Sequence, residues 1–294
     1  MFHNILIVYK DKPYHSLIRN YARHRDDANI QRLMRVKEAH LDTLKTLKTL
    51  LNKTGIRCTF IPLAKRFLVK ASAYSLIVTV GGDGTFLDVA HCIGTTPILG
   101  INSSPSYSEG FFAGLNRFDI GRPLLQLLEK LPEPLLLNRL QCSINGRPLR
   151  ELALNDALVC HPEPGATSRY IIRLGRRGPV EEQKGSGVWV ATGSGSTAAI
   201  HSAGGHVMPL TSKKIQFVAR ELYAVRKRYS LRKGIIAGGE GLSITSLMER
   251  GALCIDGPRV CYPFGYKALL QVKNAPYPLR VIGLSRTKYR KKRR

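Results

Sequence analysis

The first part of the chain alternates short apolar runs with longer amphipathic stretches. Residues Asn4–Tyr9 are aliphatic and β-branched, which is typical of a buried strand. Residues 27–51 place Ile and Leu near helical spacing and Gly55 follows as a stop signal, so we predict one long helix. Because strands alternating with helices form parallel sheets, the pattern predicts a parallel α/β domain. Its further strands are predicted at 56–61, 76–80 and 97–101.

The pattern changes near residue 135, where short strand-like runs follow one another with Gly, Pro and Asn turns between them. The dipeptide Asn145-Gly146 is a strong hairpin signal. We therefore predict a nucleotide-binding α/β domain over 1–134 and a mainly antiparallel β domain over 135–272. A strand-like piece at 279–284 would let residues 273–294 return to the first domain. Strands of the β domain are predicted at 135–144, 152–160, 170–174, 187–191, 243–245 and 269–272.

Composition narrows the class of protein. The chain has 294 residues, of which 44% are hydrophobic, so it can bury a real core and disorder is unlikely from its composition. Its apolar runs are short and interrupted, so we expect no membrane-spanning helix. The six cysteines include no pair at C-x-x-C spacing. We therefore expect no zinc or redox motif, and reduced thiols in a cytoplasmic protein.

The charge balance is strongly basic, with 46 Lys and Arg against 20 Asp and Glu, a net charge of +26. Such a charge raises the local concentration of anions such as nucleotides, polyphosphate or nucleic acid. The densest basic run is the tail at 288–294. A terminal run of this kind is usually a solvated end, and weak nucleic-acid contact is the alternative.

The strongest chemical motif is Gly-Gly-Asp-Gly-Thr at 81–85, directly after a predicted strand. Open α/β sheets bind ligands at the carboxyl ends of their strands. Glycines let the backbone approach a ligand, and the N–H groups that open the next helix suit phosphate oxygens. An acid such as Asp83 can accept a proton from a hydroxyl or help to hold Mg²⁺. The alternative interpretation is a tight turn with a purely structural role.

This pentapeptide resembles the signature shared by NAD kinases, diacylglycerol kinases and phosphofructokinases. Ala-Leu-Asn-Asp at 153–156 resembles the Ala-Leu-Asn-Glu segment of NAD kinases. The Gly/Ser/Thr-rich stretch 192–198, with Ser-Ala-Gly-Gly at 202–205, resembles another of their motifs, and Ile-Asp-Gly at 255–257 also fits. The chain thus resembles the NAD kinase family over nearly its whole length, and above all its divergent mitochondrial-type branch, a name that describes sequence and not location. The implied fold is a Rossmann-like parallel α/β domain followed by the β domain.

The resemblance implies that the protein transfers the γ-phosphoryl group of ATP to the adenosine-ribose 2′-OH of NAD and so makes NADP. Asp83 would be the catalytic residue that accepts the proton of this hydroxyl. Mg²⁺ or another divalent cation would accompany ATP, and Asp83 could touch it; we expect no other metal site. ATP or polyphosphate would be the donor, and the protein would be a homodimer or homotetramer.

The resemblance also places the nucleotides. Asn155 and Asp156 would accept hydrogen bonds from ribose hydroxyls. The chain departs from the family pattern at Ser186, where many members have an acid, and at Ala199, where they have a Tyr. We expect these departures to change the affinity for NAD or the preference between NAD and NADH. The residues implied to bind the nucleotides are Gly82, Gly84, Thr85, Asn155, Asp156, Lys184, Ser186, Gly195, Ser196, Thr197, Ala198 and Ser202.

Two other functions remain open from the sequence. A lipid kinase of the diacylglycerol type would share the glycine turn, and a basic surface would suit anionic membranes. A non-enzymatic, basic nucleic-acid-binding protein built on a kinase fold would bind RNA with strong salt dependence and without turnover. The intact Asp83 motif argues against the second, and the segments at 153–156 and 192–197 argue against the first.

Overall fold

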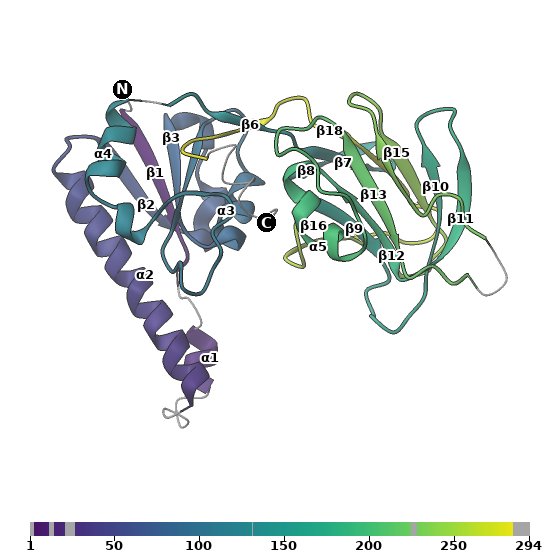
Figure 1. The fold of residues 1–294 in the computed structure, drawn as a ribbon, viewed down its shortest axis with the longest axis horizontal. Helices are drawn as coiled ribbons and strands as arrows, with labels where there is room; N and C mark the ends of the chain where they lie inside the picture. Colours follow the sequence, from purple (N-terminus) through teal and green to yellow (C-terminus); the bar gives the residue numbers. More distant parts are fainter. Residues whose placement is uncertain (1–2, 12–14, 21–26, 131, 225–227, 285–294) are drawn as a thin grey trace. The chain divides into compact units, whose positions relative to one another are not determined.

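The chain divides into two compact units in the computed structural model, which describes residues 3–11, 15–20, 27–130, 132–224 and 228–284 (Figure 1). The first unit comprises Met1–Leu135 together with Leu279–Arg294, and the second comprises Leu136–Pro278. Each unit has its own hydrophobic core. The basic tail at 288–294, which carried the nucleic-acid alternative, lies outside the described residues.

The first unit is built on a seven-stranded sheet in the order β2-β1-β3-β4-β19-β6, with β5 also paired to β4. The pairs β1–β2, β1–β3 and β3–β4 are parallel, which confirms the predicted fold class. Strand β3 is buried along its whole length, as a central strand covered on both faces should be. The strands are β1 (Asn4–Tyr9), β2 (Arg57–Pro62), β3 (Leu76–Gly81), β4 (Ile98–Asn102), β5 (Ala113–Asn116), β6 (Leu135–Leu137) and β19 (Leu279–Val281).

The long predicted helix forms as α2 (Ala28–Asn52). The carboxylate of Asp27 caps it, accepting hydrogen bonds from the N–H groups of Asn29 and Ile30. Its buried stripe recurs every three or four residues, so one face packs on the core of the sheet. The other helices of this unit are α1 (His15–Asn20), α3 (Asp83–Ala90) and α4 (Arg122–Glu129), with the short 3₁₀ segments η1 (Leu63–Leu68), η2 (Ala71–Ala73) and η3 (Arg117–Asp119).

The second unit consists of two six-stranded antiparallel sheets, in the orders β11-β10-β15-β18-β7-β8 and β14-β13-β12-β9-β16-β17. One core cluster draws residues from both sheets, including Tyr170 and Leu270 from the first and Val190 and Phe217 from the second. Its strands are β7 (Leu140–Ile144), β8 (Arg147–Ala153), β9 (Asp156–Cys160), β10 (Ser168–Leu174), β11 (Val180–Gly185), β12 (Gly187–Ala191), β13 (Ile215–Arg220), β14 (Lys233–Ile236), β15 (Leu242–Ser246), β16 (Ala252–Ile255), β17 (Val260–Pro263) and β18 (Leu269–Asn274), with η4 (Ser194–Thr197) and α5 (Ala199–Ser202) after β12.

Two predicted strands of this unit are each broken in two. The stretch 135–144 stops after Leu137 and resumes at Leu140, and the fully buried Arg139 lies in the gap, where its guanidinium donates to the carbonyl of Tyr277. The stretch 152–160 breaks at Leu154 and Asn155. Asn138 and Arg139 in the first break and Asn155 in the second are polar, but single polar residues also occur within strands, so the pattern alone did not reveal the breaks.

The predicted hairpin at Asn145-Gly146 joins β7 to β8. Both residues have positive φ, +50° and +78°, as a type I′ turn requires. Six strands of the described residues were missed: β5 in the first unit and β11, β13, β14, β16 and β17 in the second. Strand β11 shows why, because its sequence Val-Glu-Glu-Gln-Lys-Gly has no apolar alternation and it lies at a sheet edge.

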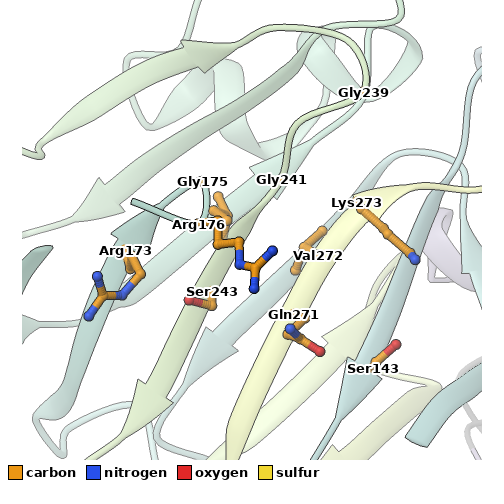
Figure 2. A pocket seen from close by; sticks show the side chains of 11 residues that line it. Ser143, Arg173, Gly175, Arg176, Gly239, Gly241, Ser243, Gln271, Val272 and Lys273 are labelled. Atoms are coloured by element: carbon orange, nitrogen blue, oxygen red, sulfur yellow. The ribbon is translucent and has the colours of Figure 1, made fainter. Parts of the chain in front are cut away.

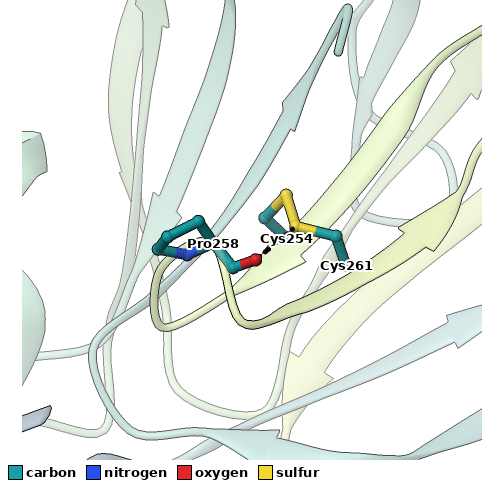
Figure 3. Close-up of a disulfide and its surroundings, with 3 residues drawn as sticks. All are labelled: Cys254, Pro258 and Cys261. Atoms are coloured by element: carbon teal, nitrogen blue, oxygen red, sulfur yellow. Dashed lines mark hydrogen bonds between the residues drawn. A yellow bond between two sulfur atoms is a disulfide. The ribbon is translucent and has the colours of Figure 1, made fainter. Parts of the chain in front are cut away.

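The prediction that the cysteines are all reduced is wrong for one pair. Cys254 and Cys261 form a disulfide between β16 and β17 (Figure 3). They face each other directly in the antiparallel register, with Cα atoms 4.1 Å apart. A separation of seven residues does not by itself indicate a disulfide, because the two cysteines meet only through the register of the hairpin. Cys58, Cys92, Cys142 and Cys160 are free thiols.

Candidate active site

The Gly-Gly-Asp-Gly-Thr turn lies where sequence patterning placed it, between buried strand β3 and helix α3. Gly82 is the N-cap residue, and its carbonyl accepts hydrogen bonds from the N–H groups of Thr85 and Phe86. A Cβ on Gly82 would overlap the hydroxyl of Ser108, so only glycine allows these two segments to approach. The N–H groups of Asp83 and Gly84 precede the first hydrogen bond of α3, and they lie directly after the carboxyl end of β3.

Asp83 is the first residue of α3 and is half-buried. Its Oδ1 accepts a hydrogen bond of 3.0 Å from the N–H of Phe112. Among the residues that the structure describes, no hydrogen-bond partner approaches the other carboxylate oxygen, Oδ2. One oxygen is therefore anchored and the other is free to meet a ligand, which is the arrangement that a positioned proton acceptor needs.

The loop after β4 supports this turn. Gly81 and Asn102 are register partners at the ends of β3 and β4, and the N–H of Ser103 donates to the carbonyl of Gly81. The side chain of Asn102 donates to the carbonyl of Ser108 and accepts from the N–H of Ser104. Asn102 thus closes the loop that places Ser108 against Gly82. Sequence patterning did not predict this role, because the partners of Asn102 are set by strand register.

In the second unit, Asp256 shapes the bend that carries Asn155 and Asp156. Its carboxylate accepts hydrogen bonds of 2.8, 2.8 and 2.9 Å from the N–H groups of Leu154, Asn155 and Asp156. Its own N–H donates to the carbonyl of Asp156. Three charge-assisted bonds to consecutive amides replace the ladder that would otherwise continue from β8 into β9. Asp256 therefore fixes the shape of this bend, a role that the motif Ile-Asp-Gly did not reveal.

Asp156 lies against Asp256 and is 5% exposed. Burial, together with the negative charge of Asp256, raises the pKa of Asp156 to about 8. At neutral pH the Asp156 carboxyl is then largely protonated, so it can donate a hydrogen bond as well as accept one. Next to it, Oδ1 of Asn155 is buried and has no hydrogen-bond partner in the described part of the chain. A buried acceptor without a partner is costly and suits a ligand hydroxyl.

The Gly/Ser/Thr-rich segment after β12 packs on this same bend. The hydroxyls of Thr192 and Ser194 both donate to the carbonyl of Leu154, over 2.6 and 2.7 Å. A Cβ on Gly195 would overlap the carbonyl of Asn155, so a glycine is required at this contact. Two segments about 40 residues apart in sequence, which the resemblance assigned to one ligand, are therefore in direct contact.

The predicted ligand residues of this segment divide by exposure. Ser196 is fully buried, and its hydroxyl donates to the carbonyl of Gly193 and accepts from the N–H of Met208. It holds the loop together. Thr197 and Ser202 are exposed and Ala198 is half-buried, so these residues are open to a ligand.

Lys184 and Ser186 lie elsewhere in the unit. They flank the start of β12, whereas Asn155 and Thr192 lie beside its end. At about 3.3 Å per residue, the two groups are roughly 15–20 Å apart. The hydroxyl of Ser186 donates to the carboxylate of Glu221, and the ammonium of Lys184 lies 4.7 Å from the centre of the Tyr223 ring. Glu221 thus supplies an acid beside Ser186, which sequence reasoning missed because it comes from another strand end.

Within the described residues, no group of three or more His, Cys, Asp or Glu side chains could hold a metal ion. In the same residues, no helix is long and apolar enough to cross a membrane.

A parallel α/β unit with a glycine-rich turn at its carboxyl edge, joined to an antiparallel β unit, defines a two-unit nucleotide kinase fold. Solved structures share it along nearly the whole chain. An NAD kinase from Archaeoglobus fulgidus in complex with ATP matches 97% of this chain and 96% of its own, with a TM-score of 0.69 and 18% identity. Yeast NADH kinase complexed with NADH matches 98% and 85%, with a TM-score of 0.69 and 16% identity.

Sequence comparison identifies the family. Residues 13–115 match the model of the ATP-NAD kinase N-terminal domain. A probable NADH kinase of Oryza sativa subsp. japonica is 32% identical over 228 residues, 70% of each chain. An NAD kinase of Methanoculleus marisnigri is 32% identical over 205 residues, 69% of this chain and 72% of its own. The chain belongs to the NAD kinase family: it is a kinase that phosphorylates NAD, and the lipid-kinase and nucleic-acid-binding alternatives are not supported.

Proposed function

We propose that Asp83 accepts the proton of the adenosine-ribose 2′-hydroxyl of NAD while that oxygen takes the γ-phosphoryl group of ATP. A bond forms between the 2′ oxygen and the γ phosphorus. The bond from that phosphorus to the β–γ bridging oxygen breaks, so that ADP leaves and NADP is the other product. The observation that carries this proposal is the pair of Asp83 oxygens: Oδ1 is held by Phe112, and Oδ2 is open at the carboxyl edge of the parallel sheet.

Phosphoryl transfer passes through a loose transition state, so the protein contributes mainly orientation and charge neutralisation. The hydrogen bond from Phe112 to Asp83 fixes the direction of the carboxylate. The N–H groups at the start of α3, including that of Gly84, are suited to phosphate oxygens. Asp83 therefore orients the hydroxyl and takes up its proton, while Gly82, Gly84 and Thr85 form the turn that receives the phosphates.

A divalent cation fits this site only together with the donor. Mg²⁺ is commonly bound by one or two carboxylates plus substrate phosphates, and Oδ2 of Asp83 is an open carboxylate oxygen at the phosphate-binding turn. When bound, the cation would neutralise charge on the transferring phosphoryl group. Asp83 would hold it from one side, and no larger cluster of described side chains competes for that role.

We also propose that the two units are the two domains of the enzyme, with NAD bound by the second. The unpartnered Oδ1 of Asn155 and the neutral carboxyl of Asp156 are suited to ribose hydroxyls, one as an acceptor and the other as donor or acceptor. Thr197, Ala198 and Ser202 line the open side of the same segment. Gly195 and Ser196 hold the segment against the Asn155 bend.

The position of Lys184 and Ser186 favours a homodimer or homotetramer, as the resemblance implies. They lie about 15–20 Å along β12 from Asn155, too far to share one ribose with it. In an oligomer these residues could contact a dinucleotide bound by a neighbouring copy. Sedimentation velocity of the full chain measures the state directly, and a monomer at micromolar concentration would contradict this proposal.

The decisive experiment measures NADP formation by the full chain with NAD, ATP and Mg²⁺, beside Asp83→Asn. We expect the variant to lose at least about a hundredfold in kcat, because general acid–base groups contribute that much or more. Asp42→Asn is the matched control, since Asp42 is an exposed acid of the same unit that forms a surface ion pair with Arg117. Equal rates for wild type and Asp83→Asn would refute the assigned role.

The same assay identifies donor and acceptor. Polyphosphate in place of ATP tests the donor, and NADH in place of NAD tests the acceptor. We expect ATP to be the better donor, because helix α3, whose N-terminus is the donor-side site, contains no Lys or Arg to hold a longer polyanion. Turnover with polyphosphate but not with ATP would overturn that assignment while leaving the role of Asp83 intact.

A further inference from the structure

The outer face of one sheet in the second unit contains a hollow of about 460 Å³ (Figure 2). The side chains of Arg173, Ser243, Gln271 and Ser143 form its floor. The strand register explains the row: Arg173 is opposite Ser243, Ser243 is opposite Gln271, and Gln271 is opposite Ser143. Four neighbouring strands, β10, β15, β18 and β7, therefore each contribute one polar side chain to a line that crosses the sheet.

The opposite face of these strands is the core. Ile172, Ile244 and Leu270 alternate with the polar row and are fully buried. The row is therefore an outward surface, which an antiparallel sheet of this kind usually presents to water.

Two glycines make this surface concave. Gly175 and Gly241 line the hollow next to the polar row, and the N–H of Gly175 donates to the carbonyl of Gly241. Neither has a side chain to fill the space above it. A Cβ on Gly241 would overlap the carbonyl of Val272. The close approach of these two segments therefore requires glycine here, and the space above it stays open.

The charge of the hollow is positive and uncompensated. Arg173, Arg176 and Lys273 are exposed, and none of them forms an ion pair within the part of the chain that the structure describes. Glu181 is opposite the core-facing Ile172, and the nearest acid in register on the same face as Arg173 is Glu182, opposite Ile171. Glu240 lies between two lining glycines but does not line the hollow itself.

The lining excludes most ligand classes. It contains no aromatic ring, and its apolar residues, Leu242 and Val272, are buried beneath the surface. A nucleobase or an apolar ligand would have nothing to stack on. Guanidinium groups, hydroxyls and an amide all donate hydrogen bonds to tetrahedral oxyanions, and arginines can do so bidentately. Three cations within one hollow favour a ligand with several negative charges.

We propose that this hollow binds a small ligand bearing two or more phosphate groups, at a site separate from those for NAD and its phosphoryl donor. Arg173, Arg176 and Lys273 hold the phosphates, and Ser143, Ser243 and Gln271 donate the remaining hydrogen bonds. None of these residues belongs to the proposed kinase site.

The test uses inorganic tripolyphosphate and isothermal titration calorimetry on the full chain at low salt, without nucleotides, because ATP and NADP themselves carry several phosphates. The variant is Arg173→Gln combined with Lys273→Gln. Its control is Lys45→Gln combined with Lys48→Gln, which removes the same charge from exposed positions of α2 in the other unit. We expect Kd to rise at least tenfold in the first variant and less than twofold in the control, with unchanged kcat for NADP formation in both.

Several results would overturn the proposal. No saturable binding to the wild type would do so, and equal weakening in both variants would show that the net charge of the chain is responsible. A KM for ATP that rises in the Arg173→Gln, Lys273→Gln variant in step with the Kd for tripolyphosphate would assign the anion to the donor site. Citrate provides the final comparison, and equal affinity for citrate and tripolyphosphate would refute the phosphate assignment. Thermal unfolding of both variants checks that each is folded.

Discussion

Asp256 illustrates how a single side chain organises a binding segment a hundred residues away. Its carboxylate receives three consecutive backbone N–H groups, from Leu154 to Asp156, and so turns β8 away from β9. Only a carboxylate offers enough acceptor positions for three donors, because the side chain of Asn has one oxygen and two N–H groups of its own. The same charge helps to keep the neighbouring Asp156 protonated. Asp256 therefore sets both the shape and the protonation state of the proposed ribose site.

Glu221 is the residue through which we expect the protein to distinguish NAD from NADH. Its carboxylate accepts the hydroxyl of Ser186, at the position where many family members have an acid. The oxidised nicotinamide ring is a cation and the reduced ring is neutral, so a nearby carboxylate favours NAD. Glu221→Gln should raise the KM for NAD about threefold to tenfold and change the KM for NADH little.

Steady-state kinetics with both acceptors measures this effect. Glu240→Gln is a suitable control, because Glu240 is an exposed acid of the same unit that lies outside the proposed site. Identical changes in KM for NAD and NADH would show that Glu221 does not discriminate by charge.

At the scale of elements, the β16–β17 hairpin supports the proposed ribose site through the position of Asp256. Strand β16 pairs with β9, and the turn after it carries Asp256. The disulfide between Cys254 and Cys261 closes this turn from both strands. The turn holds the carboxylate of Asp256 at 2.8–2.9 Å from three backbone N–H groups of the Asn155 bend. A hairpin that is less rigid should therefore weaken these hydrogen bonds and with them the conformation of the bend.

Replacing the disulfide tests this link. Cys254→Ser combined with Cys261→Ser should lower the free energy of unfolding by about 2 kcal/mol, because the bridge closes only a short loop. The KM for NAD should rise with little change in kcat, since Asp83 belongs to the other unit. Denaturant unfolding and kinetics measure both effects. Reductant should destabilise the wild type and leave the double variant unchanged, and a reductant effect of equal size in both would refute the role of this bridge.

At the scale of the whole molecule, the two units carry buried titratable groups of opposite kind. In the first, His40 joins α2 to two strand ends: its Nε2–H donates to the carbonyl of Lys10, and its Nδ1 accepts from Ser103, each over 2.8 Å. Burial is the main reason why the pKa of His40 falls to about 4. In the second unit, burial raises the pKa of Asp156 to about 8. The two units therefore respond to acid in opposite directions.

Acidification from pH 7 to pH 5 should destabilise the first unit and stabilise the second. His40 is neutral when folded and takes up a proton only on unfolding, so the first unit loses about 2 kcal/mol over this range. Asp156 is protonated when folded and releases its proton on unfolding at these pH values, so its contribution grows as the pH falls. Hydrogen exchange followed by mass spectrometry reports each unit separately. His40→Gln should flatten the response of the first unit, and an unchanged slope would contradict this assignment.

The sequence by itself determined the fold class, the family and the place of Asp83. These depend on local information: apolar periodicity marks strands and helices, and the glycine turn directly follows the strand that positions it. The long helix α2 and the hairpin at Asn145-Gly146 formed as predicted for the same reason.

Only the tertiary structure decided which distant residues meet. The contacts of Asp256 with the Asn155 bend, of Glu221 with Ser186, and of Cys254 with Cys261 are all set by strand pairing. So is the basic hollow on the outer sheet, whose row comes from four strands. Strand register and hydrogen bonds between segments far apart along the chain do not change the hydrophobic periodicity of either segment, so the sequence pattern does not reveal them. Such features therefore emerge only when the chain has folded.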